Sequence, residues 1–151
     1  MRTSQQAKEA LLSSHPTAEQ LNTAVCQLRY IDAIDFDYEQ RDIFSFLREE
    51  MRLSIGLPPE LFGDTSVSKS PREFDLSFAF SSQNPSGTMR LRFARGARGG
   101  KDALIWETAL DSSNEDPPSI QDSDAWAAKA HTLTHDWFFK IIDGKLLESF
   151  K

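Results

Sequence analysis

Residues 123–150 constrain the fold more than any other stretch; they read SDAWAAKAHTLTHDWFFKIIDGKLLESF. Apolar side chains recur here every three or four residues, as one side of a helix requires, at Trp126, Ala130, Leu133, Trp137 and Ile141. Ser119 or Ser123 is expected to cap this helix and Asp143-Gly144 to end it. A long amphipathic helix needs an apolar surface to cover, and the rest of the chain has to supply it.

Three segments between residues 73 and 110 alternate apolar and polar side chains with the period of two that is typical of half-buried strands. Turn residues 84–87 (NPSG) and glycines within 96–100 separate them. Consecutive strands with short connections predict an antiparallel meander. The side chains expected to face its core are Phe74, Leu76, Phe78, Phe80, Met89, Leu91, Phe93, Leu104, Trp106 and Leu110.

Residues 25–36 predict a further strand, because Cys26, Leu28 and Tyr30 alternate with polar residues. The alternation slips around residues 31–34, which predicts a bulge or a strand end at that point.

Two further helices are expected. Asp37 is the predicted N-cap of one that continues to Met51 and ends before Gly56. Thr3 or Ser4 is expected to cap a short one near the N-terminus, and residues 63–72 read as a loop.

These elements predict an α+β fold with the order α-β-α-β-β-β-α, in which an antiparallel sheet of about four strands packs under the long C-terminal helix. A chain of 151 residues fits one domain, 1–151. The sequence leaves open whether helix and sheet close tightly or enclose a cavity.

Composition narrows the classes of function. The net charge of −6 argues against binding to nucleic acid or to an anionic membrane, both of which favour a basic surface. Cys26 is the only cysteine, so no internal disulfide can form. No signal peptide is apparent, and no apolar run approaches the ~20 residues that span a bilayer. We therefore expect a cytoplasmic protein that does not contact a membrane.

His131 and His135 are four residues apart, so both project from one side of the last helix, and Asp124 could add an oxygen ligand. The glutamate of a protease-type HExxH motif is missing, and two helical ligands without a convergent third rarely form a metal site. We predict no metal and no cofactor, and read these histidines as boundary residues beside the apolar stripe.

Basic residues crowd the second and third strands of the meander, at Arg90, Arg92, Arg95, Arg98 and Lys101. They could bind a phosphate or an RNA backbone. The alternative is a solvated face whose charges pair with Asp75, Asp102 and Glu107.

No catalytic arrangement can be recognised. Cys26 shares the inward phase of its strand, where a thiol is a core residue and not an exposed nucleophile. Asp32, Asp35 and Asp37 are scattered over both faces of the strand, so they form no acid–base pair. The sequence argues for a protein that is not an enzyme, without deciding the point.

Phe138 and Phe139 follow Trp137 directly, and three consecutive rings cannot all face inward from one helix. At least one of the two should lie at the rim of the core or under another chain. This predicts an interface with a protein partner or with a second copy of the chain.

Several short segments of the chain match motifs of a known family. They are residues 28–32 (LRYID), Leu110-Asp111, Ala130-His131, Trp137-Phe138 and residues 143–150. Through them the chain resembles the C-terminal half of a sporadically distributed bacterial family of uncharacterised proteins. The first motif usually ends in Asn in that family, where this chain has Asp32. The resemblance implies an architecture and no activity. Because members are longer, it also implies a fragment or a shortened relative.

The function expected from these observations is a non-enzymatic binding or interaction module. Two alternatives stay open: a small apolar ligand held in a helix-over-sheet cavity, and phosphate or RNA binding on the arginine-rich hairpin.

Overall fold

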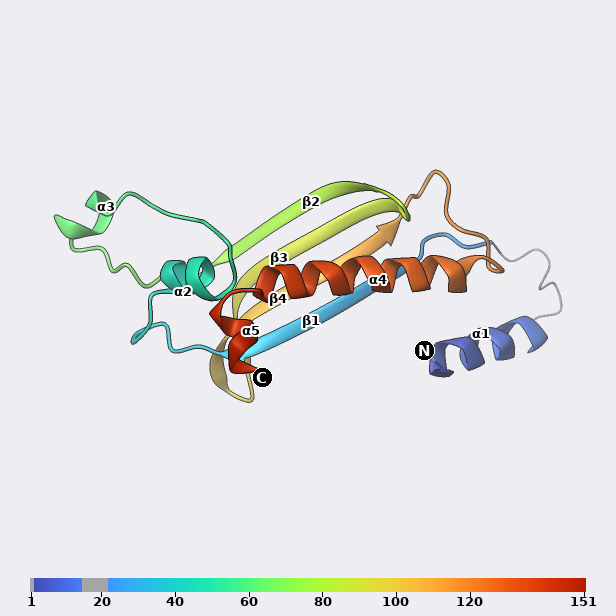
Figure 1. Cartoon of the computed structure of the whole chain (residues 1–151), viewed down its shortest axis with the longest axis horizontal. Helices are drawn as coiled ribbons and strands as arrows, with labels where there is room; N and C mark the ends of the chain where they lie inside the picture. Colours follow the sequence, from blue (N-terminus) through green and yellow to red (C-terminus); the bar gives the residue numbers. More distant parts are fainter. Residues whose placement is uncertain (1, 15–21) are drawn as a thin grey trace.

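The computed structural model describes residues 2–14 and 22–151, with side chains from residue 5 onward. Four strands form one antiparallel sheet in the order β1-β4-β3-β2 (Figure 1). Their bounds are β1 Gln27–Asp35, β2 Asp75–Gln83, β3 Ser86–Arg98 and β4 Lys101–Ser112. The last three form the predicted meander, and β1 adds to it beside β4.

Five helices accompany the sheet within the described residues: α1 (Arg2–Ser14), α2 (Ile43–Glu50), α3 (Glu60–Gly63), α4 (Ser123–Ile142) and α5 (Lys145–Ser149). The predicted α+β class, the four-stranded antiparallel sheet and the long C-terminal helix are confirmed; α3 and α5 are short additions. The cap expected at Thr3 or Ser4 lies outside the described side chains. None of the helices described has the combination of length and apolar character that a membrane crossing requires.

Helix α4 lies along one side of the sheet, where it packs on β4 and β1 (Figure 1). We call this side the covered face and the opposite side the open face. Trp126 and Ala130 of α4 are buried against Met89 and Leu110 of the sheet. The predicted apolar stripe is therefore the side of the helix that meets the sheet.

Strand β1 stays in regular register along its whole length. Tyr30 pairs with Thr108, Asp32 with Trp106 and Ile34 with Leu104, with no interruption. The bulge or strand end predicted around residues 31–34 is wrong, because β1 continues in register to Asp35. The pattern slips because a carboxylate occupies a covered-face position of an ordinary strand.

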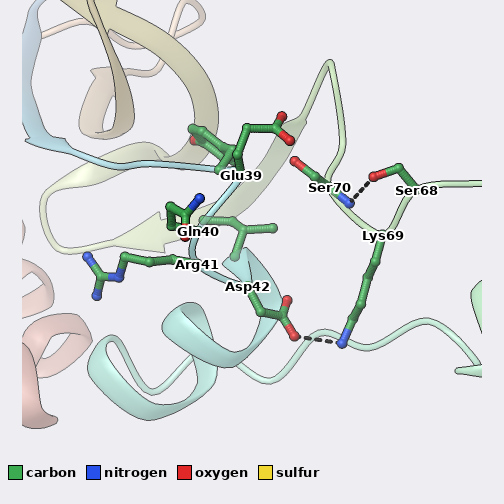
Figure 2. A pocket seen from close by; sticks show the side chains of 9 residues that line it. Glu39, Gln40, Arg41, Asp42, Ser68, Lys69 and Ser70 are labelled. Carbon is green, nitrogen blue, oxygen red and sulfur yellow. Dashed lines mark hydrogen bonds and ion pairs between the residues drawn. The ribbon is translucent and has the colours of Figure 1, made fainter.

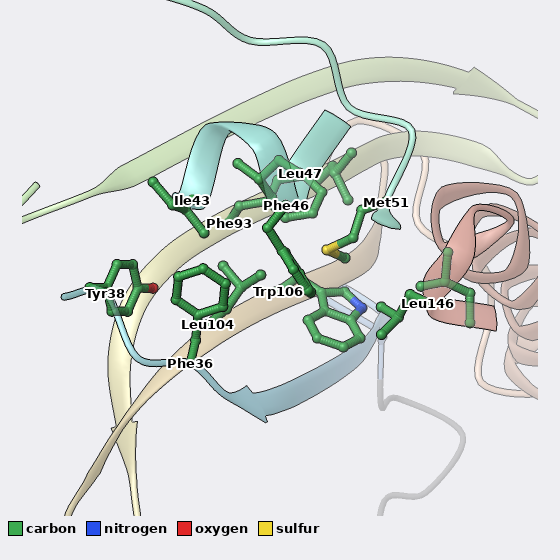
Figure 3. Packing of buried hydrophobic residues seen from close by; sticks show 12 residues of the cluster. Phe36, Tyr38, Ile43, Phe46, Leu47, Met51, Phe93, Leu104, Trp106 and Leu146 are labelled. Carbon is green, nitrogen blue, oxygen red and sulfur yellow. The ribbon is translucent and has the colours of Figure 1, made fainter. Parts of the chain in front are cut away.

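Helix α2 closes one end of the core over the sheet, as Figure 3 shows. Its residues Phe46 and Leu47 are buried in one cluster with Phe93 and Trp106. A second cluster forms under the first half of α4. Trp137 packs against both, so this half-buried ring joins the two parts of the core.

The predicted start of α2 is wrong. Asp42 is its N-cap, and the Asp42 side chain accepts the Phe44 N–H at 3.0 Å. Asp37 instead accepts the N–H groups of residues 39 and 40 in the preceding turn. Phe36 and Tyr38, two residues apart, are both buried in the core, which holds the chain out of a helix at this point.

The predicted cap of α4 is also wrong. Asp122 occupies the N-cap position and makes no side-chain cap hydrogen bond. The Ser119 hydroxyl donates to Asp122 Oδ2 at 2.6 Å, and the Ser123 hydroxyl to the Ile120 carbonyl at 2.7 Å. Both serines are used within the turn before the helix.

Candidate functional site

A cleft of about 270 Å³ lies between α4 and the edge of the sheet formed by β1 and β4. We call it the α4–β1 cleft. Strand β1 contributes two lining side chains, β4 one and α4 five: Tyr30, Asp32, Thr108, His131, Thr134, His135, Phe138 and Phe139. It brings together both histidines considered for a metal and both phenylalanines considered for an interface.

The periodicities of the two elements explain why these residues meet. Tyr30 and Asp32 are two residues apart on a regular strand, so both point to the covered face. Along α4 the lining residues fall at i, i+3, i+4, i+7 and i+8 from His131. This second stripe runs beside the apolar one and faces the β1 edge.

Aromatic rings form the rim of the cleft. The Tyr30 hydroxyl and His131 Nδ1 are hydrogen bonded at 2.6 Å. The centroids of His135 and Phe139 are 4.6 Å apart, and those of Phe138 and Phe139 are 5.2 Å apart with planes at 85°. The rings are turned sharply against one another, so their faces point in different directions around a concave wall.

Deeper in the cleft the side chains are more buried. Phe138 stacks on Trp106 at 6.2 Å between centroids, which ties this wall to the core. Thr134 is buried, and its hydroxyl donates to the Ala130 carbonyl at 2.8 Å. Thr108 is 1% exposed, and its hydroxyl has no hydrogen-bond partner among the described residues. An unpaired buried hydroxyl costs free energy, which a ligand could recover.

Asp32 is the one acidic side chain of the lining. Burial raises its pKa above the ordinary value, and no cation of the described chain forms an ion pair with it. Most other aspartates do form such pairs, among them Asp35 with Arg98 at 2.9 Å and Asp102 with Arg95 at 2.7 Å. Asp32 thus stands out as a half-buried carboxylate without a charged partner.

The third ligand considered for a metal lies elsewhere. Asp124 forms an ion pair with Lys8 of α1 at 2.9 Å. Within residues 2–14 and 22–151, no three histidine, cysteine or acidic side chains come close enough together to hold a metal ion. His131 and His135 themselves are neighbours, with ring centroids 5.7 Å apart.

The arginines of the hairpin do not form one patch. Arg90 and Arg92 lie on the open face, in ion pairs with Asp111 at 2.7 Å and Asp75 at 2.6 Å. Arg95 is on the covered side, over the ring of Tyr38 at 4.3 Å. Arg98 reaches across to β1, and Lys101 begins β4 at the turn.

A polar cavity of about 280 Å³ lies beside the start of α2, as Figure 2 shows. Lys69 Nζ donates to Asp42 Oδ2 at 2.6 Å, and the Ser70 N–H donates to Ser68 Oγ at 3.2 Å. The Asp42 carboxylate already caps α2. Asp42 and Lys69 are thus used to hold the loop against the helix, whereas the buried Ser70 hydroxyl has no hydrogen-bond partner among the described residues.

Sequence reasoning missed four lining residues of the α4–β1 cleft, namely Tyr30, Asp32, Thr108 and Thr134. One signal was present: Asp32 falls in phase with Leu28 and Ile34, the apolar residues of its strand. A carboxylate at an inward position of a regular strand is a local inconsistency of the kind that functional sites contain.

No protein-family model matches this chain, and no curated protein or solved structure is detectably similar to it. The resemblance to the bacterial family therefore stays a prediction from the residues.

Proposed function

We propose that this protein is a binding module whose α4–β1 cleft takes a small, largely apolar molecule with one polar group. The observation that carries the proposal is a pair of polar groups in a largely aromatic cleft. Among the described residues, the buried Thr108 hydroxyl has no hydrogen-bond partner and the half-buried Asp32 carboxylate forms no ion pair. Ligand sites typically combine apolar walls with a few polar groups that fix the orientation of the ligand.

The volume sets the size of that molecule. A cavity of ~150 Å³ holds benzene, so 270 Å³ suits a ligand of roughly ten non-hydrogen atoms. The cleft opens to solvent along a rim that includes Tyr30 and Phe139, both partly exposed. A ligand could thus enter without separation of the helix from the sheet.

The interaction module expected from the sequence competes for the same surface, because Phe138 and Phe139 are lining residues. A concave site with unpartnered polar groups favours a small ligand over a flat protein contact. A single sedimenting species of monomer mass at micromolar concentration would agree with this choice. The bacterial, cytoplasmic setting expected from the sequence belongs to the same proposal.

The test is a titration with aromatic fragments of about ten heavy atoms, in which binding is monitored by chemical-shift changes of the backbone amides in NMR spectra. Shifts are expected at Thr108 and Thr134. Phe139→Ala should weaken binding about fivefold by removing part of the apolar wall. Phe80→Ala is the matched control: Phe80 is 45% exposed against 41% for Phe139, but lies on β2 and does not line the cleft.

The control should leave the affinity within about twofold of the wild type, since Phe80 lines no part of the cleft. Fragments that shift only residues around Trp137 and Ile141, where a second apolar cavity of about 200 Å³ lies, would contradict the assignment. So would an equal loss in both variants.

A further inference from the structure

The chemistry of the α4–β1 cleft indicates the charge of its ligand, an inference that rests on the proposed function. The lining of the cleft holds one acidic side chain, Asp32, and two histidines, His131 and His135, but neither lysine nor arginine. A bound anion would face Asp32 without a fixed cation to balance it. A bound cation would give this half-buried carboxylate the partner that it lacks in the described chain.

The aromatic walls of the cleft also favour a positively charged ligand. The faces of phenol and phenyl rings carry negative electrostatic potential and attract ammonium groups within about 6 Å of the centroid. Here the planes of Tyr30 and His131 are inclined at 57°, and those of His135 and Phe139 at 51°. Rings inclined in this way direct their faces differently, and it is the faces of Tyr30 and Phe139, not the ring edges, that attract a cation.

The buried hydroxyl adds a hydrogen-bond acceptor. Thr108 lies directly across from Tyr30 in the β1–β4 pairing, next to the Asp32–Trp106 pair. Its oxygen can accept an N–H bond, as can the Asp32 carboxylate. A protonated amine carries up to three such donors, whereas a carboxylate or phosphate ligand offers mainly acceptors.

We propose that the ligand is a compact organic cation, a protonated amine on an apolar body of roughly ten non-hydrogen atoms. Its ammonium group pairs with Asp32 and donates to the Thr108 hydroxyl. Its apolar body lies against Phe138 and Phe139, and the rings of the rim surround the charge.

Three probes of the same shape test this proposal: phenethylammonium, phenethyl alcohol and phenylacetate, titrated by calorimetry near neutral pH. The wild type should bind the ammonium at least about tenfold more tightly than the alcohol, and phenylacetate most weakly, because a hydrogen bond to a charged group is stronger than a neutral one. Added salt should reduce the preference for the ammonium.

Two aspartate variants separate the role of Asp32 from general electrostatics. Asp32→Asn should bring the ammonium and the alcohol to similar affinity. Asp35→Asn removes a charge from the same strand, but that side chain points to the open face and pairs with Arg98, so the preference should persist. Thr108→Val should weaken the binding of phenethylammonium about threefold. An unchanged affinity would exclude the Thr108 hydroxyl as a hydrogen-bond acceptor for the ligand.

The outcomes distinguish the two proposals. Equal binding of the ammonium and the alcohol by the wild type would overturn the cation and leave the ligand cleft standing. A preference that survives Asp32→Asn would also overturn it. Absence of binding by all three probes, with amide shifts unchanged by the wider fragment set, would overturn the cleft itself.

Discussion

Asp32 is a charged residue at a position of β1 where the alternation of the strand calls for an apolar side chain. Its neighbours in phase, Leu28 and Ile34, pack against the core, while Asp32 carries a charge into the same face of the sheet. Burial raises the pKa of this carboxyl because the charged form loses part of its hydration. A group of this kind reduces the stability of the free protein, and a bound partner can reverse the effect.

Asp32→Asn is therefore expected to stabilise the free protein near neutral pH. Since the folded-state pKa is raised, the carboxyl favours folding most below its unfolded pKa, and that contribution is lost as the pH rises through the folded value. Water screens this partly exposed group, so we expect a gain of only about 1–2 °C in Tm.

Thermal unfolding of the wild type and of Asp32→Asn, from pH 7 down to about pH 3.5, checks this prediction. The difference in Tm between them should disappear as Asp32 becomes protonated. Asp116→Asn, in an exposed loop, is the control and should change Tm little at any pH. A variant that is less stable than the wild type at pH 7 would contradict the argument.

At the scale of elements, α2 depends on its cap. Asp42 accepts the Phe44 N–H, and also receives hydrogen bonds from Ser45 and Lys69. Burial alone would raise the pKa of Asp42, but these hydrogen bonds outweigh it and hold the pKa below the ordinary value. The cap matters because Phe46 and Leu47 of this short helix close one end of the core.

Asp42→Ala should cost about 1 kcal/mol of unfolding free energy, measured by urea denaturation at neutral pH. Because the folded pKa is lowered, the carboxylate stabilises the fold above its unfolded pKa, and this contribution disappears as the pH falls through the folded value. The difference in unfolding free energy between Asp42→Ala and the wild type should thus become smaller below about pH 4.

Asp37→Ala distinguishes the two candidate caps. Asp37 accepts the N–H groups of residues 39 and 40 in a turn and none from α2, so its loss should cost less than that of Asp42. The reverse order of the two costs would show that the helix begins at the earlier position.

The elements that the sequence predicts well are those with one strong period. The alternation of Phe74 to Phe80 and the stripe from Trp126 to Ile141 each define a face, and the structure places those faces together. The start of α2 could not be predicted in this way, since Asp37 and Asp42 are both good caps. The burial of Phe36 and Tyr38, a tertiary effect, decides between them.

The cleft is a further case in which tertiary contacts decide. His131, His135, Phe138 and Phe139 could be placed on one helix from spacing alone, but their partner Tyr30 lies about a hundred residues earlier, as the hydrogen bond between Tyr30 and His131 shows. Only the pairing of β1 with β4 brings these segments together. Sequence reasoning therefore found four of the five helical residues of the site and missed Thr134 and the three residues on the strands.

For the molecule as a whole, the two sides of the sheet carry different chemistry. The covered face holds the core and the cleft. On the open face four arginines meet four carboxylates at 2.6–2.9 Å: Arg29 with Glu107, Arg90 with Asp111, Arg92 with Asp75 and Arg98 with Asp35. Arginines that are already paired, on a protein of net charge −6, offer little attraction to a phosphate backbone.

We therefore expect that single-stranded RNA binds with a Kd weaker than roughly 100 µM at physiological salt, measured by fluorescence anisotropy. Replacing Arg90 and Arg92 by Glu should lower the stability, because it places like charges beside Asp111 and Asp75, and should leave RNA binding undetectable. Tight RNA binding that weakens with salt and disappears in this double variant would instead make the open face a nucleic-acid site. The ion pairs of Arg90 and Arg92 would then belong to the RNA-free protein only. The covered face would still hold the α4–β1 cleft in that case, because the two faces share no side chain.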